Sequence, residues 1–332
     1  MCRVRTIKTD YHLMFGLILF FSYFLFGKSW NDEILTIATE IMFRNLGDTG
    51  PSLVNRVLQM VGEQLERPSL AGSWLSYLER PPFNTDCFNH WRYTQKPFGP
   101  YIEMHSNEDD LKSTLVSLSK GLTAGTISGA WAYHFSFKTL LCLYLESFSP
   151  IHNSEYFGDA FPNGDDSGRK YMIKYNGETM SLHDFWDTGC GQYSSKYPFS
   201  VIDWRRIDTE VTNIIKANPS GSYPSISIVV EDIINESYHL SQYVYPNTIS
   251  PNTELPTEYV DSCKSLVSKR IPLAAYSLAK FLKTINIPNI VPPNSKSPIS
   301  ASEAIAWAVM CFLVPLATFL TWNYFHKKTK AD

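Results

Sequence analysis

Apolar residues recur at helical spacing through most of the central part of the chain. In an amphipathic helix they return every three or four positions and so line one face. This period predicts helices over residues 32–46, 52–65, 109–122, 182–187, 203–217, 226–243 and 258–284. A further segment, residues 136–148, is apolar on nearly every face, which is typical of the central helix of an all-α domain.

Two stretches between the predicted helices have no helical period. Residues 80–101 contain four prolines, and residues 149–175 are rich in Asn, Asp and Gly. Because these residues break helices and favour turns, both stretches are predicted to be irregular loops. The sequence shows no internal repeat and no second periodic block, so it predicts a single helical domain over residues 30–285.

The N-terminal end of the chain carries a longer apolar run. Residues 13–26 follow a basic segment and precede small residues, which is the plan of a secretory signal peptide. At about fourteen residues the run is short for a membrane span. We therefore predict a signal peptide over residues 1–29, with cleavage before Trp30. A buried or anchoring helix is the alternative.

The C-terminal run, residues 304–324, contains no charged side chain and is followed by a lysine cluster. About twenty apolar residues span a bilayer, and adjacent positive charge favours the cytoplasmic side. This predicts a transmembrane helix over residues 303–325, a cytoplasmic tail over 326–332 and a proline-rich stalk over 286–302. We expect a single-pass type I membrane protein whose body is extracellular or lies in the secretory lumen.

Composition and charge narrow the possible functions. The chain has 332 residues, of which 44% are hydrophobic and 18% charged, so it can bury a sizeable core and is not intrinsically disordered. Its formal charge is −3, and the +3 of the signal segment and the +2 of the tail leave about −8 on the body. An acidic body does not attract a polyanion by its overall field, so binding of nucleic acid needs a local cation.

The predicted body contains four cysteines, Cys87, Cys142, Cys190 and Cys263. An extracellular or lumenal space is oxidising, so these cysteines could form disulfides. Six cysteines in the whole chain are too few for a disulfide scaffold, and their spacing leaves the pairing open.

A histidine and an aspartate stand four positions apart in the predicted helix 182–187. On a helix His183 and Asp187 face the same way, and an imidazole and a carboxylate at that spacing can bind one zinc ion. Glu146 and His152, at and beyond the end of the central helix, could supply further ligands. Such pairs are usually solvated neighbours or form a hydrogen bond on the helix surface, so the spacing alone leaves both interpretations open.

Several motifs extend this observation. They are Gly-Ser-Trp at 72–74, the segment 91–98, Pro-Ile-His at 150–152, Ser-Leu-His-Asp-Phe-Trp-Asp-Thr-Gly at 181–189, Glu-Ser-Tyr at 236–238 and the segment 259–279. In this order they resemble motifs of the zinc-dependent, single-strand-specific nucleases of the mung bean nuclease type. The resemblance implies one compact all-α domain of the zinc nuclease and phospholipase C-like type. It also implies a three-zinc centre that hydrolyses single-stranded nucleic acid or 3′-nucleotides.

The resemblance implies metal-binding roles for five residues. His152, His183 and Asp187 match the two histidines and the aspartate that hold one zinc ion in the family. Glu146 stands where the family has an aspartate ligand. Trp30 matches the N-terminal tryptophan whose amino group and carbonyl bind zinc, which agrees with cleavage before this residue.

Other ligand positions of the family have changed. This sequence has Leu35, Arg92 and Cys142 where the family has histidines, and Ser76 where it has an aspartate. Leucine and serine do not replace imidazole and carboxylate as strong ligands, whereas Cys142 could bind zinc as a thiolate. An arginine that faces the cluster repels a divalent ion. We therefore expect a broken three-zinc centre that holds one zinc ion or none.

Cationic and aromatic residues near these positions are candidates for binding a substrate. A guanidinium can bind phosphate, which makes Arg92 and Arg169 candidate phosphate contacts. Arg169 replaces an asparagine of the family's substrate segment. Tyr93 and Phe98, in the predicted loop, are candidates for stacking a nucleobase.

Three functions from different classes remain open. In the first, the chain is a degenerate nuclease homologue with lost or much reduced phosphodiester hydrolysis that binds phosphate or a nucleotide. In the second, it is a metal-dependent nuclease or 3′-nucleotidase with an altered one-zinc centre. In the third, it is a structural or interaction ectodomain without metal. The sequence assigns no catalytic residue.

Overall fold

The computed structural model describes residues 30–81, 83, 85, 87–101 and 110–288, and within these ranges the chain is mostly α-helical, as predicted. The α-helices are α2 (Asp32–Leu46), α3 (Thr49–Gln59), α4 (Trp74–Leu78), α5 (Leu111–Ala124), α6 (Ala130–Glu146), α7 (Leu182–Asp187), α8 (Val201–Ala217), α9 (Val230–His239), α10 (Ser241–Val244) and α11 (Thr257–Leu282). Short 3-10 helices are η1 (Pro68–Ser73), η2 (Asn89–Arg92), η3 (Pro150–Asn153) and η4 (Ser220–Ser222).

The predicted ends of the chain lie outside the described residues. This applies to the signal peptide over 1–29, to the transmembrane helix over 303–325, to the tail over 326–332 and to all but the start of the stalk. Among the residues that are described, no helix has both the length and the apolar character that crossing a bilayer requires.

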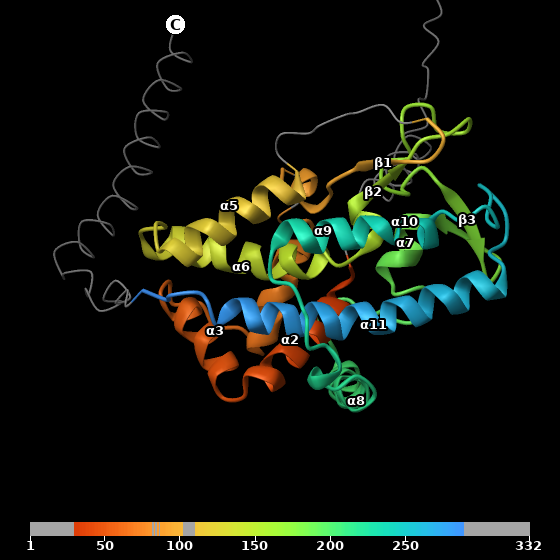
Figure 1. Cartoon of the computed structure of the whole chain (residues 1–332). Helices are drawn as coiled ribbons and strands as arrows, with labels where there is room; N and C mark the ends of the chain where they lie inside the picture. The colour runs from red at the N-terminus through yellow and green to blue at the C-terminus, as the bar shows by residue number, and fades with distance from the viewer. Residues whose placement is uncertain (1–29, 82, 84, 86, 102–109, 289–332) are drawn as a thin grey trace, which may run out of the picture.

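Two helices form the centre of the packing. α2 contacts α11, α8, α3 and η1, and α6 contacts α5, α11, α4 and η1. α6 is buried along nearly its whole length, which agrees with its apolar sequence. Figure 1 shows α5, α6, α9 and α11 lying side by side along the molecule, with the short strands gathered at one end. The site described below forms where the C-terminal end of α6 meets α7.

Helix ends follow the sequence where a capping residue is present. α2 and α7 have the predicted bounds, because the side chains of Asn31 and Ser181 accept the backbone N–H of Ile34 and Asp184. The predicted helix 226–243 is divided into α9 and α10. The division falls at Leu240, whose N–H donates to Ser237 O in the tighter 3-10 pattern.

The structure has two short strand pairs, and three of their four strands lie in the stretches that were predicted to be irregular. β1 (Lys96–Phe98) pairs in parallel with β2 (Ser154–Tyr156), and β3 (Met172–Tyr175) pairs antiparallel with β4 (Glu178–Ser181). Strands this short give no readable alternation in the sequence. They matter for the site, because β1–β2 brings η2 beside η3 and the β3–β4 hairpin leads directly into α7.

The structure pairs two of the four cysteines of the body. Cys190, just after α7, forms a disulfide with Cys263 of α11, and their Cα atoms are 6.0 Å apart. Cys87 is exposed and Cys142 is buried, and both are free thiols. The disulfide therefore ties the helix that carries His183 and Asp187 to the longest helix of the domain.

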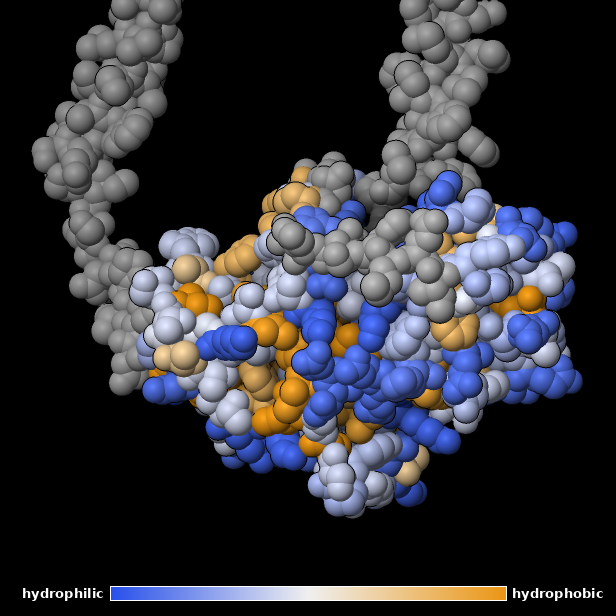
Figure 2. Space-filling view, turned by 45° about the horizontal axis from the view of Figure 1, so that its top comes forward, coloured by the Kyte–Doolittle hydropathy of each residue, from blue (hydrophilic) through white to orange (hydrophobic). Residues whose placement is uncertain are grey.

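The face of the molecule in Figure 2 is mixed in character. Hydrophobic residues, in orange, form a patch that is bordered by hydrophilic residues, in blue. Large apolar side chains that are exposed among the described residues include Trp131, Val201 and Ile202. Apolar atoms make up much of the surface of folded domains, so these exposed side chains by themselves assign no partner.

Loss of the disulfide should destabilise the domain. The bond joins residues 73 positions apart, and a loop of that length corresponds to about 4 kcal/mol in the chain-entropy treatment. We expect the double variant Cys190→Ser/Cys263→Ser to lose about that much free energy of unfolding in denaturant titrations. Cys87→Ser, at the exposed free thiol, is the control and should leave the free energy of unfolding unchanged.

Candidate metal centre

Three side chains that were predicted to hold one zinc lie together in the structure. His152 Nε2 is 3.1 Å from Asp187 Oδ1, and His183 Nε2 is 3.1 Å from Asp187 Oδ2. One ligand atom from each residue lies within 4.8 Å of the others, and all three side chains are buried. The two imidazole rings are nearly parallel, with their centroids 5.4 Å apart. We call these three residues the His-His-Asp clasp.

His152 is positioned by the turn that follows α6. η3 begins with Pro150, which suits the first position of a helical turn. Asn153 donates from its amide to Ser147 O at 2.9 Å and to Ser149 O at 2.8 Å, which fixes the turn against the end of α6. The backbone N–H of Thr94 donates to His152 O at 2.8 Å, so the segment before β1 holds His152 from the other side.

The other two residues of the clasp are positioned by α7 and the segment before β3. His183 Nδ1 lies 2.7 Å from Ser167 O, and the His183 backbone N–H donates to Gly168 O at 3.2 Å. Gly168 has φ +85°, and a Cβ there would lie 3.1 Å from the backbone nitrogen of His183 at the start of α7. Glycine is therefore required for this segment to approach α7 so closely.

The hydrogen-bond pattern of the clasp fits a bound cation. A carbonyl oxygen only accepts, so His183 Nδ1 carries a proton and, in the neutral ring, Nε2 presents a lone pair to the Asp187 carboxylate. Two facing acceptors need a proton or a metal ion between them. His152 Nδ1 is also buried with no hydrogen-bond partner among the described residues. Two imidazoles and a carboxylate form a donor set that suits zinc.

Electrostatics keep the clasp ready to bind a cation. Burial raises the pKa of Asp187, but His183 and His152 outweigh this effect and lower that pKa to about 2. Burial lowers the pKa of His152, and Asp187 only partly opposes this effect. At neutral pH the clasp therefore presents a carboxylate anion and a neutral His152 imidazole, which are the ligand forms that a metal needs.

A second cluster lies beside the clasp and is centred on Arg92. Its guanidinium is fully buried and donates from Nη2 to Ser76 Oγ at 3.2 Å and to Cys142 Sγ at 3.8 Å. It also forms ion pairs from Nε to Glu79 Oε1 at 3.1 Å and from Nη1 to Glu146 Oε1 at 3.5 Å. We call these five residues the Arg92 cluster.

The Arg92 cluster gathers four positions at which the resemblance implied zinc ligands. Ser76, Arg92, Cys142 and Glu146 converge, and the cation at their centre is the arginine's own guanidinium. Cys142 Sγ donates to Glu146 Oε1 at 3.2 Å, so Glu146 contacts both the thiol and Arg92. Among the described residues, the groups suited to holding a metal comprise the clasp and do not include Glu146 or Cys142.

Burial sets the protonation states in the Arg92 cluster. Burial lowers the pKa of Arg92, but Glu146 and Glu79 outweigh this effect and hold it above its ordinary value. Burial, followed by the charge of Glu146, raises the pKa of the Cys142 thiol well above its ordinary value. A thiol that keeps its proton is not a zinc ligand, which differs from the expectation of a Cys142 thiolate.

Arg92 and Tyr93 are enclosed, in contrast to their predicted roles in binding a substrate. Arg92 is 0% exposed, with its charge facing Glu79 and Glu146, so its guanidinium does not reach solvent phosphate. Tyr93 is 4% exposed, and its ring packs edge-on against the rings of His152 at 5.0 Å and His183 at 5.4 Å. Phe98, on β1, stacks on Tyr245 at 5.9 Å.

Arg169 covers the site from the solvent side. Its Cζ atom lies 4.0 Å from the centroid of the Tyr93 ring, and Nη1 is 3.4 Å from Asp166 Oδ1. The side chain of Arg169 is 23% exposed, in contrast to that of Arg92. Of the two arginines predicted to bind phosphate, Arg169 is therefore the accessible one.

The remaining predicted positions lie on or before α2. Trp30 is buried, and the backbone N–H of Asn31 donates to Asp187 O at 3.0 Å, which places the start of the domain beside the clasp. Leu35 is fully buried in the apolar core of the domain. A leucine there contributes packing, and no ligand atom.

Sequence analysis missed Glu79, the second carboxylate partner of Arg92. Its position carried a signal, because residues three apart on a helix share a face, and Glu79 follows Ser76 by three at the end of α4. The family motif drew attention to Ser76 alone. Only the fold shows that Glu79, one helical turn after Ser76, lies beside Arg92.

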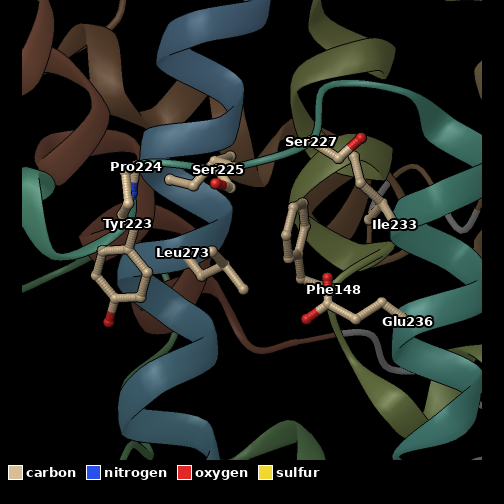
Figure 3. Close-up of a pocket in the computed structure, with 9 residues that line it drawn as sticks. Phe148, Tyr223, Pro224, Ser225, Ser227, Ile233, Glu236 and Leu273 are labelled. Carbon is tan, nitrogen blue, oxygen red and sulfur yellow. The ribbon is translucent and has the colours of Figure 1, made fainter.

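A separate pocket lies away from these residues. It has a volume of about 380 Å³ and lies between α9, α11 and the segment 223–227, as Figure 3 shows. Phe148, Ile233 and Leu273 form its apolar wall, and Glu236 lies at one end, paired with the buried Arg270. No residue of the clasp or of the Arg92 cluster lines it.

Comparison with known families agrees with the geometry. The sequence model of the S1/P1 nuclease family matches residues 36–286, which is more than half of the chain. The chain therefore belongs to the S1/P1 nuclease family, and the predicted resemblance is confirmed. A comparison with curated proteins gives no match. Family membership supports a nuclease-like function, with zinc as the usual metal and nucleic acid as the usual ligand.

The buried Glu79 should make stability depend on pH. Burial raises its pKa to about 7, although Arg92 opposes this effect, because one guanidinium faces two carboxylates. A raised carboxyl pKa favours the fold below pH 4.5, and this contribution is lost as the pH rises through 7. The shift corresponds to about 3 kcal/mol. We expect the unfolding free energy of the unmodified chain to fall by about that amount between pH 4 and pH 8, and we expect Glu79→Gln to abolish this fall.

The matched control for this measurement is the exposed Glu178 of β4. Glu178→Gln should leave the difference in unfolding free energy between the two pH values as in the unmodified chain. If Glu79→Gln retains the full pH-dependent loss, ionised Glu79 is already offset by Arg92 and our assignment of its charge is wrong.

Proposed function

We propose that this protein is a degenerate member of the S1/P1 nuclease family that retains one metal site. In this proposal, phosphodiester hydrolysis is lost or much reduced, and the protein binds phosphate or a nucleotide. The observation that carries the proposal is the fully buried guanidinium of Arg92 among Ser76, Glu79, Cys142 and Glu146.

The reason is the difference between a guanidinium and a metal ion. In a multi-metal site, one ion activates the attacking water while another stabilises the leaving oxygen, and the substrate bridges both. Arg92 supplies a positive charge but has no open coordination position, and its donors already face two carboxylates and a hydroxyl. Loss of a comparable electrostatic contact costs about 10²–10³ in rate.

The clasp is where a zinc ion would be held. His152, His183 and Asp187 would bind it, and zinc bound there would polarise a water or phosphoryl oxygen. Ser167 O orients the His183 ring, and the turn of η3 orients His152. Arg169, the accessible guanidinium beside the clasp, is the residue that we assign to an anionic group.

The intact clasp also favours a second candidate, an active nuclease with one zinc ion. A single zinc can generate a nucleophile near neutral pH without a second metal. Release of nucleotides from single-stranded DNA that a chelator abolishes would support this candidate. A third candidate, an ectodomain without metal, requires a purified chain that contains no zinc.

Zinc content and activity test the proposal together. We expect elemental analysis of the natively purified chain to give about one zinc per chain, because one donor set is complete among the described residues. Cleavage of single-stranded DNA should be absent, or about 10²–10³ below that of a three-zinc family member assayed in parallel. His183→Ala should remove the zinc. Three zinc ions per chain would contradict the proposal.

Replacement of Arg92 tests whether its buried guanidinium stands in the place of a metal ion. In Arg92→His the built-in cation is gone, and an imidazole faces Glu79, Glu146 and Cys142. We expect this variant to bind about one additional zinc per chain, since these groups are zinc ligands once a metal offsets their charge. Arg205→His, at an exposed arginine on α8, is the control. Unchanged zinc content in a folded Arg92→His variant would refute this interpretation of the cluster.

We further propose that the protein is exported and anchored by a C-terminal transmembrane helix over residues 303–325. The Cys190–Cys263 disulfide supports an oxidising compartment. The full chain should remain with membranes during alkaline extraction, whereas a chain that ends at residue 302 should be released. Extraction of both chains would contradict the anchor.

A further inference from the structure

The clasp is closed by two stacked side chains. The Tyr93 ring covers the imidazoles of His152 and His183, and the guanidinium of Arg169 lies over the outer face of that ring. The clasp residues are buried beneath this stack, whereas Arg169 is partly exposed above it. A ligand that approaches the clasp from the Arg169 side must displace this pair.

Hydrogen bonds from two separate segments hold Arg169 in place. We call the contacts of Asp166 with Arg169 and Gln95 the latch. Asp166 accepts from Arg169 Nη1 at its carboxylate, 3.4 Å away, and at its backbone oxygen, 3.5 Å away. The Gln95 amide donates to the same carboxylate oxygen at 3.3 Å, which links the segment after Tyr93 to the segment before Arg169. These contacts lie at the long end of the hydrogen-bond range, and Asp166 is 40% exposed, so the latch is weak.

The backbone of both segments is strained at the latch. Gln95, Asp166 and Ser167 have φ values of 47°, 57° and 51°, in the left-handed region that non-glycine residues seldom adopt. Such conformations persist where the surrounding contacts enforce them, and they concentrate at ligand clamps and switch regions. Asp166 and Ser167 lie two to three positions before Arg169, and Gln95 lies two positions after Tyr93.

The charges around Arg169 select the kind of ligand that would release it. Its guanidinium is attracted by Asp166, Asp187 and Glu79. A zinc ion in the clasp would offset Asp187 and leave an excess of positive charge between the metal and Arg169. A phosphate group is the ligand that offsets both charges, since a guanidinium pairs with its oxygens more strongly than with a half-exposed carboxylate.

We propose that Tyr93 and Arg169 form a cap over the clasp, and that a phosphate group opens it by taking the place of Asp166 on Arg169. The inference rests on the proposed function, because it assigns the ligand class and the means of access to the same site. Free phosphate and the phosphate of a nucleotide share this chemistry.

Zinc release tests the cap in the full chain loaded with zinc. Without the Arg169–Tyr93 stack, we expect Arg169→Ala to lose zinc to a colorimetric chelator about tenfold faster than the unmodified chain, in phosphate-free buffer. Arg205→Ala, which removes an exposed arginine on α8, is the matched control and should release zinc at the unmodified rate. Equal release rates for Arg169→Ala and the unmodified chain would overturn the cap.

Phosphate affinity tests the exchange between Asp166 and the ligand. Calorimetry with inorganic phosphate, adenosine monophosphate and adenosine separates free phosphate, nucleotide phosphate and base. We expect Asp166→Asn to bind phosphate several-fold more tightly, Arg169→Ala to lose that binding, and adenosine not to bind. Unchanged phosphate affinity in Asp166→Asn would overturn the exchange.

Failure of the cap or of the exchange can be distinguished from failure of the proposed function. Measuring phosphate binding with and without zinc keeps the exchange testable in a chain that holds no metal. A chain without zinc whose phosphate binding still depends on Arg169 and Asp166 refutes the proposed function and supports the exchange. A chain with one zinc that Arg169→Ala does not release faster overturns the cap and leaves the proposed function intact.

Discussion

The ion pairs of the buried Arg92 with Glu79 and Glu146 are the interactions on which the whole centre depends. Two carboxylates in a water-free interior need a cation, because an unpaired buried charge costs several kcal/mol. A metal ion can supply that charge, and here a side chain supplies it instead. The guanidinium is part of the chain and pairs with residues at the ends of α4 and α6, whereas a metal ion can exchange, bind water and accept a substrate. In the proposed function, the same scaffold preserves its packing while one site loses its chemistry.

The clasp differs from the Arg92 cluster because it consists of two histidines and an aspartate, with no arginine or lysine among its three residues. Its three side chains share a carboxylate that faces two imidazoles, an arrangement that a proton or a metal completes. The adjoining Tyr93 and Arg169 are the two side chains that we propose as its cap. In that proposal, metal binding, access and anion binding are coupled through one stack of side chains.

The sequence predicted the helical fold well and the strands poorly. α2 and α7 followed from the apolar period and from the capping residues Asn31 and Ser181, which act within a few residues of one another. β1 and β2 could not be predicted, because their pairing joins segments far apart in the chain and each strand has only three residues. The pairing of Cys190 with Cys263 could not be predicted for the same reason. The two cysteines are 73 positions apart, and the sequence does not show which residues lie close together in space.

The sequence by itself determined which residue types are available: two histidines and an aspartate are predicted to form one metal site, and Leu35, Ser76 and Arg92 stand where the resemblance implies other ligands. It also determined family membership, since the motifs occur in order. Only the tertiary structure decided where the side chains point. Arg92 turns inward because Glu79 and Glu146 are buried together, and the side chain of Arg169 stays partly exposed above Tyr93. Residue identity specifies what a group can bind, whereas the charges that packing places around it determine what it does bind.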